Sequence, residues 1–326
     1  MAETSPAPFF TEIARGPDGG EAHWLATRDG QRIRAGHWRP TGEALGTILL
    51  FPGRTEYIEK YGPFASDMTE RGFAVLAVDW RGQGLADRAL ADRRLGHVDH
   101  FDDFQQDVAA LMDHARTLDL PQPWYLIGHS MGGAIGLRAL YEGLPVAACA
   151  FTAPMWGIRI PFALRPAARL LARFGAALGL SEKLVPTTTI EQYVQVTPFE
   201  GNTLTTDADM YAFLQLQMAK KPDLVLGGPT VQWLAQAMIE CAALREKTSP
   251  DVPCVTFLGE NEQIVSTEAV HDRMTRWPSG TLDLVPEAQH EILMEQLHIR
   301  TRVCDAIATH FKKHKSTQGH KSAVGG

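Results

Sequence analysis

Residues 126–133 read Leu126-Ile127-Gly128-His129-Ser130-Met131-Gly132-Gly133 and contain a Gly-x-Ser-x-Gly pattern. An apolar run at 124–127 precedes the pattern, and a helix-compatible run at 134–141 follows it. A strand that turns sharply into a helix needs very small residues on both sides of its apex, and Gly128 and Gly132 meet that need. The turn lifts the Ser130 hydroxyl clear of the sheet, beside the free N–H groups of the helix. The stretch therefore predicts a nucleophilic serine.

Short apolar segments alternate with helical ones on both sides of this stretch. An Asp-Gly pair between the alternating segments 23–28 and 32–38 predicts a hairpin. The alternation of short apolar segments with helical ones predicts an α/β fold with a mostly parallel central sheet and helices on both faces. The predicted strands are 47–51, 73–78, 124–127, 145–151, 254–258 and 281–285, and the predicted helices are 63–71, 101–118, 134–141, 267–276 and 291–311.

The interval 157–247 interrupts the alternation, because it shows no clear strand and only the helical stretches 167–178, 207–218 and 230–244. It lies between two sheet strands, so the chain must leave the sheet and return, which predicts an inserted helical cap. The predicted organisation is an N-terminal extension (1–20), a core (21–156 and 248–313), the cap (157–247) and a disordered tail (314–326). The histidines near that end, His310, His314 and His320, are interpreted as solvated rather than metal-binding.

Composition narrows the function classes. The chain has 326 residues with a net charge of −7, which argues against a nucleic-acid surface. The four cysteines (149, 241, 254 and 304) are scattered, without the spacing of a metal site, so reduced thiols, no metal and no cofactor are expected. We see neither a signal-peptide pattern at the start nor an apolar stretch of about 18 residues, so a cytoplasmic protein is expected.

A serine nucleophile needs a base, and in a Ser…acid…His order the histidine comes last. His290 follows the last predicted strand and is expected to open the last helix, so it is the predicted base. The other histidines are worse placed. His129 lies inside the turn, and the remaining candidates lie in a loop before a helix or within helices: His97, His100, His271 and His298.

The acid should follow the strand at 254–258. No aspartate lies between Asp251 and Asp272, so a glutamate must serve. Glu262 is the predicted acid, with Glu260 as its rival. The acid would hold the imidazole tautomer and stabilise the imidazolium without taking the proton.

An oxyanion hole needs two backbone N–H donors, for which we predict Met131, after the nucleophile, and Arg54, after the strand at 47–51. Two interpretations of the Arg54 side chain stay open: it contacts a substrate head group, or it forms an ion pair with Glu56 or Glu59. Asp79, also at a strand end, is interpreted as a buried loop anchor rather than a second acid.

At these positions the sequence resembles the α/β-hydrolase superfamily, and more closely its monoacylglycerol lipase and bacterial lysophospholipase branch, which is often grouped with the serine aminopeptidases. The resemblance spans roughly residues 21–312. It rests on the motifs at 51–57, 79–84, 128–133, 227–230, 259–265 and 290–293. Two departures are Pro52-Gly53 where many relatives have His-Gly, and Glu262 where the family usually has aspartate.

The resemblance implies a serine hydrolase that cleaves carboxylic esters of single-chain lipids through an acyl-enzyme on Ser130. Alternatives are a small-ester esterase, an aminopeptidase, or a catalytically silent binding protein. The head group, chain length and oligomeric state stay open. The predicted substrate contacts are Tyr57, Met155, Trp156, Met210, Phe213 and Trp233.

The cap begins with a basic amphipathic segment. Arg165, Arg169 and Arg173 repeat every four residues and share one helical face, and Phe162, Leu170 and Phe174 add apolar surface. One interpretation is an ordinary solvated cap helix. The other is peripheral contact with an anionic membrane at the inner membrane surface, through which the cap feeds lipid to Ser130.

Overall fold

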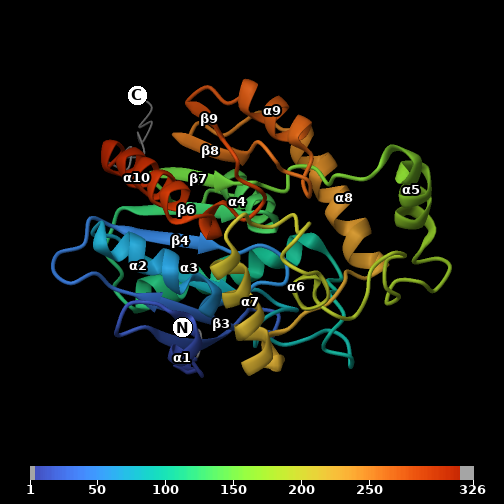
Figure 1. Ribbon diagram of the computed structural model, residues 1–326, viewed down its shortest axis with the longest axis horizontal. Coiled ribbons are helices and arrows are strands. Elements are labelled where there is room, and N and C mark those ends of the chain that lie inside the picture. The colour runs from blue at the N-terminus through green and yellow to red at the C-terminus, as the bar shows by residue number, and fades with distance from the viewer. Residues whose placement is uncertain (1–3, 316–326) are drawn as a thin grey trace, which may run out of the picture.

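The computed structural model describes residues 4–315, and its centre is a nine-stranded sheet (Figure 1). The strands are β1 (Thr4–Pro6), β2 (Glu21–Ala26), β3 (Arg32–Trp38), β4 (Thr47–Phe51), β5 (Ala74–Asp79), β6 (Trp124–His129), β7 (Ala148–Thr152), β8 (Cys254–Gly259) and β9 (Gly280–Val285). Their order is β1-β2-β3-β5-β4-β6-β7-β8-β9. In this order, the first three pairs (β1·β2, β2·β3 and β3·β5) are antiparallel. All later pairs, from β5·β4 to β8·β9, are parallel.

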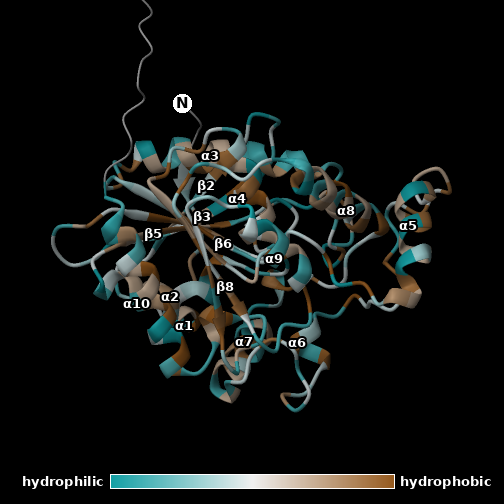
Figure 2. Ribbon diagram, turned by 90° about the horizontal axis from the view of Figure 1, so that it is seen from above, coloured by the Kyte–Doolittle hydropathy of each residue, from teal (hydrophilic) through white to brown (hydrophobic). Residues whose placement is uncertain are grey.

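The central strands are apolar along their whole length because the sheet is covered on both faces. Every residue of β4, β5 and β6 is buried. Helices α2 (Gly62–Glu70) and α10 (Leu297–Lys313) pack together on one face, and α3 (Phe104–Thr117) and α4 (Met131–Tyr141) on the other (Figure 2). The structure confirms the predicted mostly parallel sheet with helices on both faces.

The remaining helices lie at the ends of the sheet and in the insert between β7 and β8. They are α1 (Thr11–Ala14), α5 (Arg165–Phe174), α6 (Tyr193–Val196), α7 (Ala208–Lys220), α8 (Val231–Glu246) and α9 (Thr267–Thr275). Single-turn 3₁₀ helices are η1 (Ile58–Tyr61), η2 (Phe101–Asp103), η3 (Phe162–Leu164), η4 (Pro222–Leu224) and η5 (Ile292–Met294).

The predicted last helix, 291–311, is wrong at its start. His290 does not open it, because η5 comes first and α10 begins only at Leu297. The reason is Glu295, whose backbone is extended (φ −79°, ψ 174°) and whose buried carboxylate accepts hydrogen bonds from the N–H groups of Gln289 and Thr206. Those bonds hold Glu295 extended between η5 and α10, and His290 lies in the loop before η5 rather than at the start of α10.

The insert between β7 and β8 leaves the sheet and returns to the neighbouring strand. α8 packs on α4 of the core, whereas α5 packs on α8 and has no buried residue. Figure 1 shows α5 at the far side of α8 from the sheet. The division into core and cap stays a prediction that this arrangement supports.

The ends of the chain are only partly covered by the structure. In the predicted N-terminal extension, β1 pairs with β2 and α1 follows it. From residue 316 onward the predicted tail, with His320, lies outside the described residues. Among residues 4–315, no helix combines the length and the apolar character needed to cross a bilayer.

Candidate active site

Ser130 sits at a strained turn between β6 and α4. Its backbone adopts φ 49° and ψ −117°, a conformation that L-residues rarely hold outside functional sites. A Cβ on Gly128 would lie 2.8 Å from the Gly132 carbonyl oxygen, and one on Gly132 would collide with the Phe51 backbone. The two glycines are therefore required by close packing, and the Ser130 side chain stands at the N-terminus of α4.

His290 lies beside that hydroxyl. Its Nε2 is 2.9 Å from Ser130 Oγ, and its ring is buried in the loop between β9 and η5. At this distance the imidazole can accept the serine proton. The structure thus brings together the predicted nucleophile and the predicted base, from positions 160 residues apart.

Glu262 lies on the other side of the His290 ring, so Ser130, His290 and Glu262 form a hydrogen-bonded row. Its Oε2 is 2.8 Å from His290 Nδ1, and its Oε1 accepts hydrogen bonds from the N–H groups of Ile264 (2.6 Å) and Val265 (3.0 Å). Glu260, the rival, is exposed. Of the two glutamates, only Glu262 contacts the imidazole among residues 4–315.

The environment of Glu262 favours its ionised form. Burial raises the pKa of the carboxyl, but His290 and the N–H groups of Ile264 and Val265 outweigh burial and place that pKa below its usual value. An ionised carboxylate at neutral pH accepts the Nδ1 proton and leaves Nε2 free to act as a base.

The two predicted oxyanion donors follow neighbouring strands. Phe51 of β4 pairs with Gly128 of β6, so the segments that carry Arg54 and Met131 leave the sheet side by side. In the described part of the chain, neither backbone N–H donates a hydrogen bond to another protein group. Both N–H groups therefore have free hydrogen-bonding capacity, and their role in binding an oxyanion stays a prediction.

A buried charged group, here called the Lys60 cluster, lies under these loops. It comprises Lys60, Glu56, Glu291 and His129. The Lys60 ammonium contacts Glu56 at 2.5 Å and Glu291 at 2.7 Å, and His129 Nε2 lies 3.4 and 3.3 Å from the same two carboxylates. Glu56 also accepts the N–H of Gly53, so it fixes the loop that carries Arg54.

The charges of the cluster stabilise one another. Burial lowers the pKa of Lys60, but Glu291 and Glu56 outweigh it and raise that pKa. Burial likewise opposes the charged form of His129, and the same carboxylates raise its pKa above the usual value. Burial raises the pKa of Glu291, but Lys60 and His129 bring it well below its usual range.

Sequence reasoning missed this cluster, although two signals were present. Glu56 and Lys60 are four residues apart, and His129 and Glu291 are the direct neighbours of Ser130 and His290. The cluster also resembles a metal site, because ligand atoms of Glu56, His129 and Glu291 lie within 4.8 Å of one another. The ammonium of Lys60 contacts both of those carboxylates, so a cation from the protein itself already takes the place of a metal ion.

Ser130 and His290 line a cavity of about 270 Å³. The Lys60 cluster contributes Lys60, Glu56 and Glu291 to its polar side. The apolar wall comes mainly from the insert and consists of Val194, Leu204, Leu214, Met218 and Ile264. A cavity with the nucleophile beside an apolar wall suits an ester with an apolar acyl group.

Of the predicted substrate contacts, only Tyr57 lines the Ser130 cavity. The other five lie outside it because their side chains pack elsewhere. Met155 and Trp156 are buried beneath the turn, Met210 and Phe213 face Arg300 and Arg15, and Trp233 faces Arg54. Met210 and Phe213 of α7 and Trp233 of α8 therefore pack outside this cavity, whereas Met218 of α7 lines it.

The Arg54 side chain forms neither of the ion pairs considered from the sequence. Within residues 4–315 it pairs with no carboxylate, and its Nη1 donates to the Gly227 carbonyl at 2.8 Å. Asp79 is a loop anchor, as interpreted from the sequence. Its buried carboxylate accepts hydrogen bonds from Arg34 and from the N–H groups of Ile58 and Leu85.

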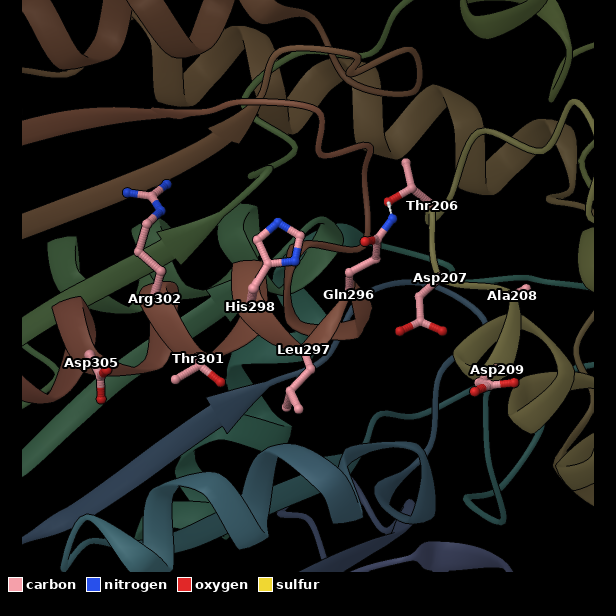
Figure 3. A pocket seen from close by; sticks show the side chains of 10 residues that line it. All are labelled: Thr206, Asp207, Ala208, Asp209, Gln296, Leu297, His298, Thr301, Arg302 and Asp305. Carbon is pink, nitrogen blue, oxygen red and sulfur yellow. Dashed lines mark hydrogen bonds between the residues drawn. The ribbon is translucent and has the colours of Figure 1, made fainter.

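A larger depression of about 1100 Å³ lies elsewhere, where the N-terminal ends of α7 and α10 meet (Figure 3). Its lining contains neither Ser130 nor His290. Figure 3 shows the side chains of Asp207, Leu297 and Asp305 spread apart rather than converging on a point. We therefore assign the chemistry to the smaller cavity at Ser130.

Known proteins resemble this chain in sequence. The profile of the family "Serine aminopeptidase, S33" matches residues 42–297. Lysophospholipase L2 of Escherichia coli (strain K12) is 32% identical over 295 residues, which cover 84% of this chain and 83% of that protein. Monoglyceride lipase of Rattus norvegicus is 32% identical over 121 residues, 36% of this chain and 37% of that protein.

Solved structures share the fold at low identity. A soluble variant of the monoglyceride lipase from Saccharomyces cerevisiae superimposes with a TM-score of 0.69 at 20% identity, covering 96% of this chain and all of that one. A thermostable carboxyl esterase from Bacillus coagulans gives a TM-score of 0.72 at 16% identity, covering 92% of this chain and all of that one. These structures support the architecture around Ser130.

Proposed function

This chain belongs to the serine aminopeptidase S33 family of α/β-hydrolases, and on that basis we propose that it hydrolyses carboxylic esters of single-chain lipids, such as lysophospholipids and monoacylglycerols. The observation that carries the proposal is the hydrogen-bonded row Ser130–His290–Glu262 at one end of a cavity with an apolar wall. The names of its relatives, lysophospholipase and monoglyceride lipase, support the substrate class.

In the proposed reaction, Ser130 Oγ attacks the ester carbonyl carbon while His290 Nε2 takes the hydroxyl proton. The tetrahedral oxyanion accepts the N–H groups of Arg54 and Met131, each worth on the order of 3 kcal/mol in the transition state. As the intermediate collapses, His290 protonates the leaving alcohol and an acyl-enzyme remains.

Deacylation repeats these steps with water as the nucleophile. His290 takes a proton from water, hydroxide adds to the acyl carbon, and Ser130 leaves with the proton held by His290. The fatty acid is released and the serine hydroxyl is restored. Glu262 stays ionised throughout, because its pKa lies below its usual value.

The charges around the cavity disfavour the aminopeptidase alternative. A free peptide amino group needs an unpaired carboxylate, and the two carboxylates in the cavity lining, Glu56 and Glu291, are both engaged by Lys60. The complete Ser130–His290–Glu262 row likewise favours an active enzyme over a silent binding protein.

Labelling with a fluorophosphonate probe tests the serine. We expect a covalent adduct on the native protein and none on Ser130→Ala, with hydrolysis of a lysophospholipid and a monoacylglycerol reduced by a factor of about 10⁴ or more in the variant. An aminoacyl-p-nitroanilide and a p-nitrophenyl acetate serve as comparison substrates. A faster turnover of p-nitrophenyl acetate than of a long-chain p-nitrophenyl ester, or of the anilide than of the long-chain lipids, would reject the lipid assignment.

We also propose that α5 touches an anionic membrane surface during catalysis. Phe162, Leu170 and Leu178 are 84, 59 and 69% exposed, and Arg165, Arg169 and Arg173 are exposed beside them. In Figure 2 this helix lies at the edge of the molecule, beyond α8, and carries both hydrophobic and hydrophilic residues. Exposed apolar side chains with arginines suit the interface of anionic lipids.

Liposome flotation tests this contact. We expect binding to vesicles that contain anionic lipid, weaker binding to neutral vesicles, and loss of binding when Arg165, Arg169 and Arg173 are changed to Glu. A control with the equally exposed Arg28, Arg93 and Lys312 changed to Glu carries the same charge change. Equal flotation of the two triple variants would refute a role for α5.

A further inference from the structure

A second cavity adjoins the one at Ser130, and Arg54 lies where the two meet. The second cavity has a volume of about 340 Å³. The residues that line both cavities are Arg54, Thr55, Gln192 and Tyr193. The cavity with the nucleophile and a second cavity of similar size therefore lie on two sides of the same four residues.

The guanidinium of Arg54 has few partners. Among the described residues it forms no ion pair with a carboxylate and makes one hydrogen bond, to the Gly227 carbonyl. Its carbon lies 5.4 Å from the centre of the Trp233 ring. Burial lowers the pKa of Arg54 to about 10, which still leaves a cation at neutral pH.

Other poorly exposed arginines are better satisfied. Arg34 pairs with Glu59 and Asp79, and Arg81 pairs with Asp29 and Asp107. Arg88, which pairs with no carboxylate in residues 4–315, donates to three carbonyl oxygens. Arg54 alone of these keeps most of its five N–H donors unused, in a cavity beside the nucleophile.

We propose that the Arg54 side chain binds the phosphodiester of a lysophospholipid, so that this residue selects phosphate-bearing lipids over neutral ones at Ser130. The proposal rests on the function proposed above. Guanidinium donates in pairs to phosphate oxygens, which makes arginine suited to this group. A lysophospholipid that spans the two cavities would place its acyl chain beside Ser130 and its head group in the second cavity.

The main chain and the side chain of Arg54 lie in the same order as the ester and the phosphate of a lysophospholipid. The Arg54 backbone N–H is the predicted oxyanion donor, and its side chain extends from that point to Gly227 in the lining of the second cavity. In a lysophospholipid, the glycerol carbons separate the ester from the phosphate. One residue can therefore contact both groups, with its main chain on the ester and its side chain on the phosphate.

The rest of the second cavity is suited to a polar head group. Its lining includes the consecutive residues Thr187, Thr188 and Thr189, and Glu191 is its one carboxylate, exposed to solvent. Thr55 and Thr187, both in this lining, have φ of 68° and 77°. Left-handed backbone is costly for β-branched residues, and such strain gathers at binding sites.

The test compares kcat/KM for a lysophosphatidylethanolamine and a monoacylglycerol with the same acyl chain. For Arg54→Gln, we expect the ratio of phosphate to neutral substrate to fall about 10- to 100-fold, the usual range for losing charge-assisted hydrogen bonds. Any general disturbance of the oxyanion loop lowers both values and cancels in the ratio. Arg54→Lys, which keeps the charge, should recover part of the ratio.

Arg94→Gln is the matched control, because the backbone carbonyl of Arg94 accepts the N–H of Gly227 while its side chain pairs with Asp92 at the surface. We expect its ratio to equal that of the native protein. An unchanged ratio in Arg54→Gln would overturn the proposal. If the native protein hydrolysed neither lipid and did not react with the fluorophosphonate probe, the proposed function itself would be refuted.

Discussion

Glu262 occupies the acid position with a side chain one methylene longer than aspartate, and its loop holds the carboxylate at both oxygens. One oxygen contacts His290 Nδ1 and the other accepts the N–H groups of Ile264 and Val265. These two backbone N–H groups hold the carboxylate of the longer side chain in position. The geometry is therefore built around glutamate rather than strained by it.

At the residue scale we predict that Glu262→Asp is less active than the native enzyme, although aspartate is common in relatives. Shortening the side chain withdraws the carboxylate either from His290 or from the two N–H groups. We expect kcat on a p-nitrophenyl ester to fall about 10-fold for Glu262→Asp and about 10³- to 10⁴-fold for Glu262→Gln, which favours the wrong imidazole tautomer.

Glu260→Gln is the control for these variants, because Glu260 is exposed and does not contact the imidazole. Its kcat should match that of the native protein. If Glu260→Gln lost activity and Glu262→Gln kept it, the assignment of the acid would be wrong.

At the scale of elements, the Lys60 cluster joins three segments that carry the chemistry. Lys60 and Glu56 belong to the η1 region after the Arg54 loop, His129 ends β6, and Glu291 follows His290. The first segment contributes two charged groups to this buried contact, and each of the other two contributes one. The relative positions of the nucleophile, the base and the oxyanion loop thus depend on one ammonium group.

We predict that Lys60→Met destabilises the fold by about 3–5 kcal/mol, because it leaves two buried carboxylates without their main partner. Urea unfolding measures the change. The double variant Lys60→Met/Glu291→Gln should recover part of the loss, since one of the two carboxylates is then neutral. The exposed Lys312→Met should change stability by less than about 0.5 kcal/mol, and an equally small change in Lys60→Met would contradict the prediction.

A second buried group of titratable side chains lies where α3 packs on β2. His114 of α3 is buried with the rings of His23 and His37 nearby, and its ring centre is 5.0 Å from that of His23. Burial lowers the pKa of His114 to about 4. Between pH 6.5 and 4 the unfolded chain therefore binds more protons at this residue, and the fold loses stability as the pH falls.

We predict that His114→Leu weakens this acid sensitivity. The difference in unfolding free energy between pH 7 and pH 5 should shrink by about 2 kcal/mol, as expected for one histidine with that pKa change. Urea titrations at the two pH values provide the measurement, and His271→Leu, at an exposed position, is the control. An undiminished pH difference in His114→Leu would show that the residue is not a source of acid sensitivity.

The sequence predicted most of these elements because strand and helix periodicities are local. β4, β8 and the turn at Ser130 were placed within a residue or two, and the order of the motifs led to His290 and Glu262. The Lys60 cluster was missed because pairing between residues 56 and 291 depends on the assembled sheet. The early helix start failed because Glu295 is held by distant Thr206 and by Gln289.

The difference between local pattern and long-range contact also explains why most of the predicted substrate contacts lie outside the Ser130 cavity. Aromatic and methionine side chains in α7 and α8 have the spacing of a helix face, and that pattern cannot separate a packed face from a cavity wall. Trp233 lies against Arg54 rather than in the Ser130 cavity, and Phe213 lies against Arg15. Only contacts between the insert and the core determine which side chains reach Ser130.

At the scale of the whole molecule, stability is unevenly distributed. α8 is tied to the core by packing on α4 and by the ion pair between Arg138 and Glu240. α5 has no buried residue and rests on α8 alone among the longer helices it packs against. Segments with little burial open first.

We predict that, within residues 4–311, trypsin first cleaves the native protein after Arg169 or Arg173. Mass spectrometry of early fragments identifies the site, and anionic vesicles should slow that cleavage if α5 rests on lipid. Arg302, exposed on the well-packed α10, is the internal reference and should be cut later. Early cleavage at Arg302 would show that α5 is not the weakest segment.

The pairing of β7 with β8 has a consequence for how such a protein can diversify. The two strands lie side by side, although the whole insert separates them in sequence, so the sheet itself holds both ends of the insert together. Replacement by a segment of another length costs little in chain closure. Ser130, Glu262 and His290 lie outside the insert, whereas Gly227 and Trp233, which hold Arg54, lie within it. Evolution, or a designer, can therefore exchange the segment that holds the Arg54 side chain in place and keep the Ser130–His290–Glu262 row intact.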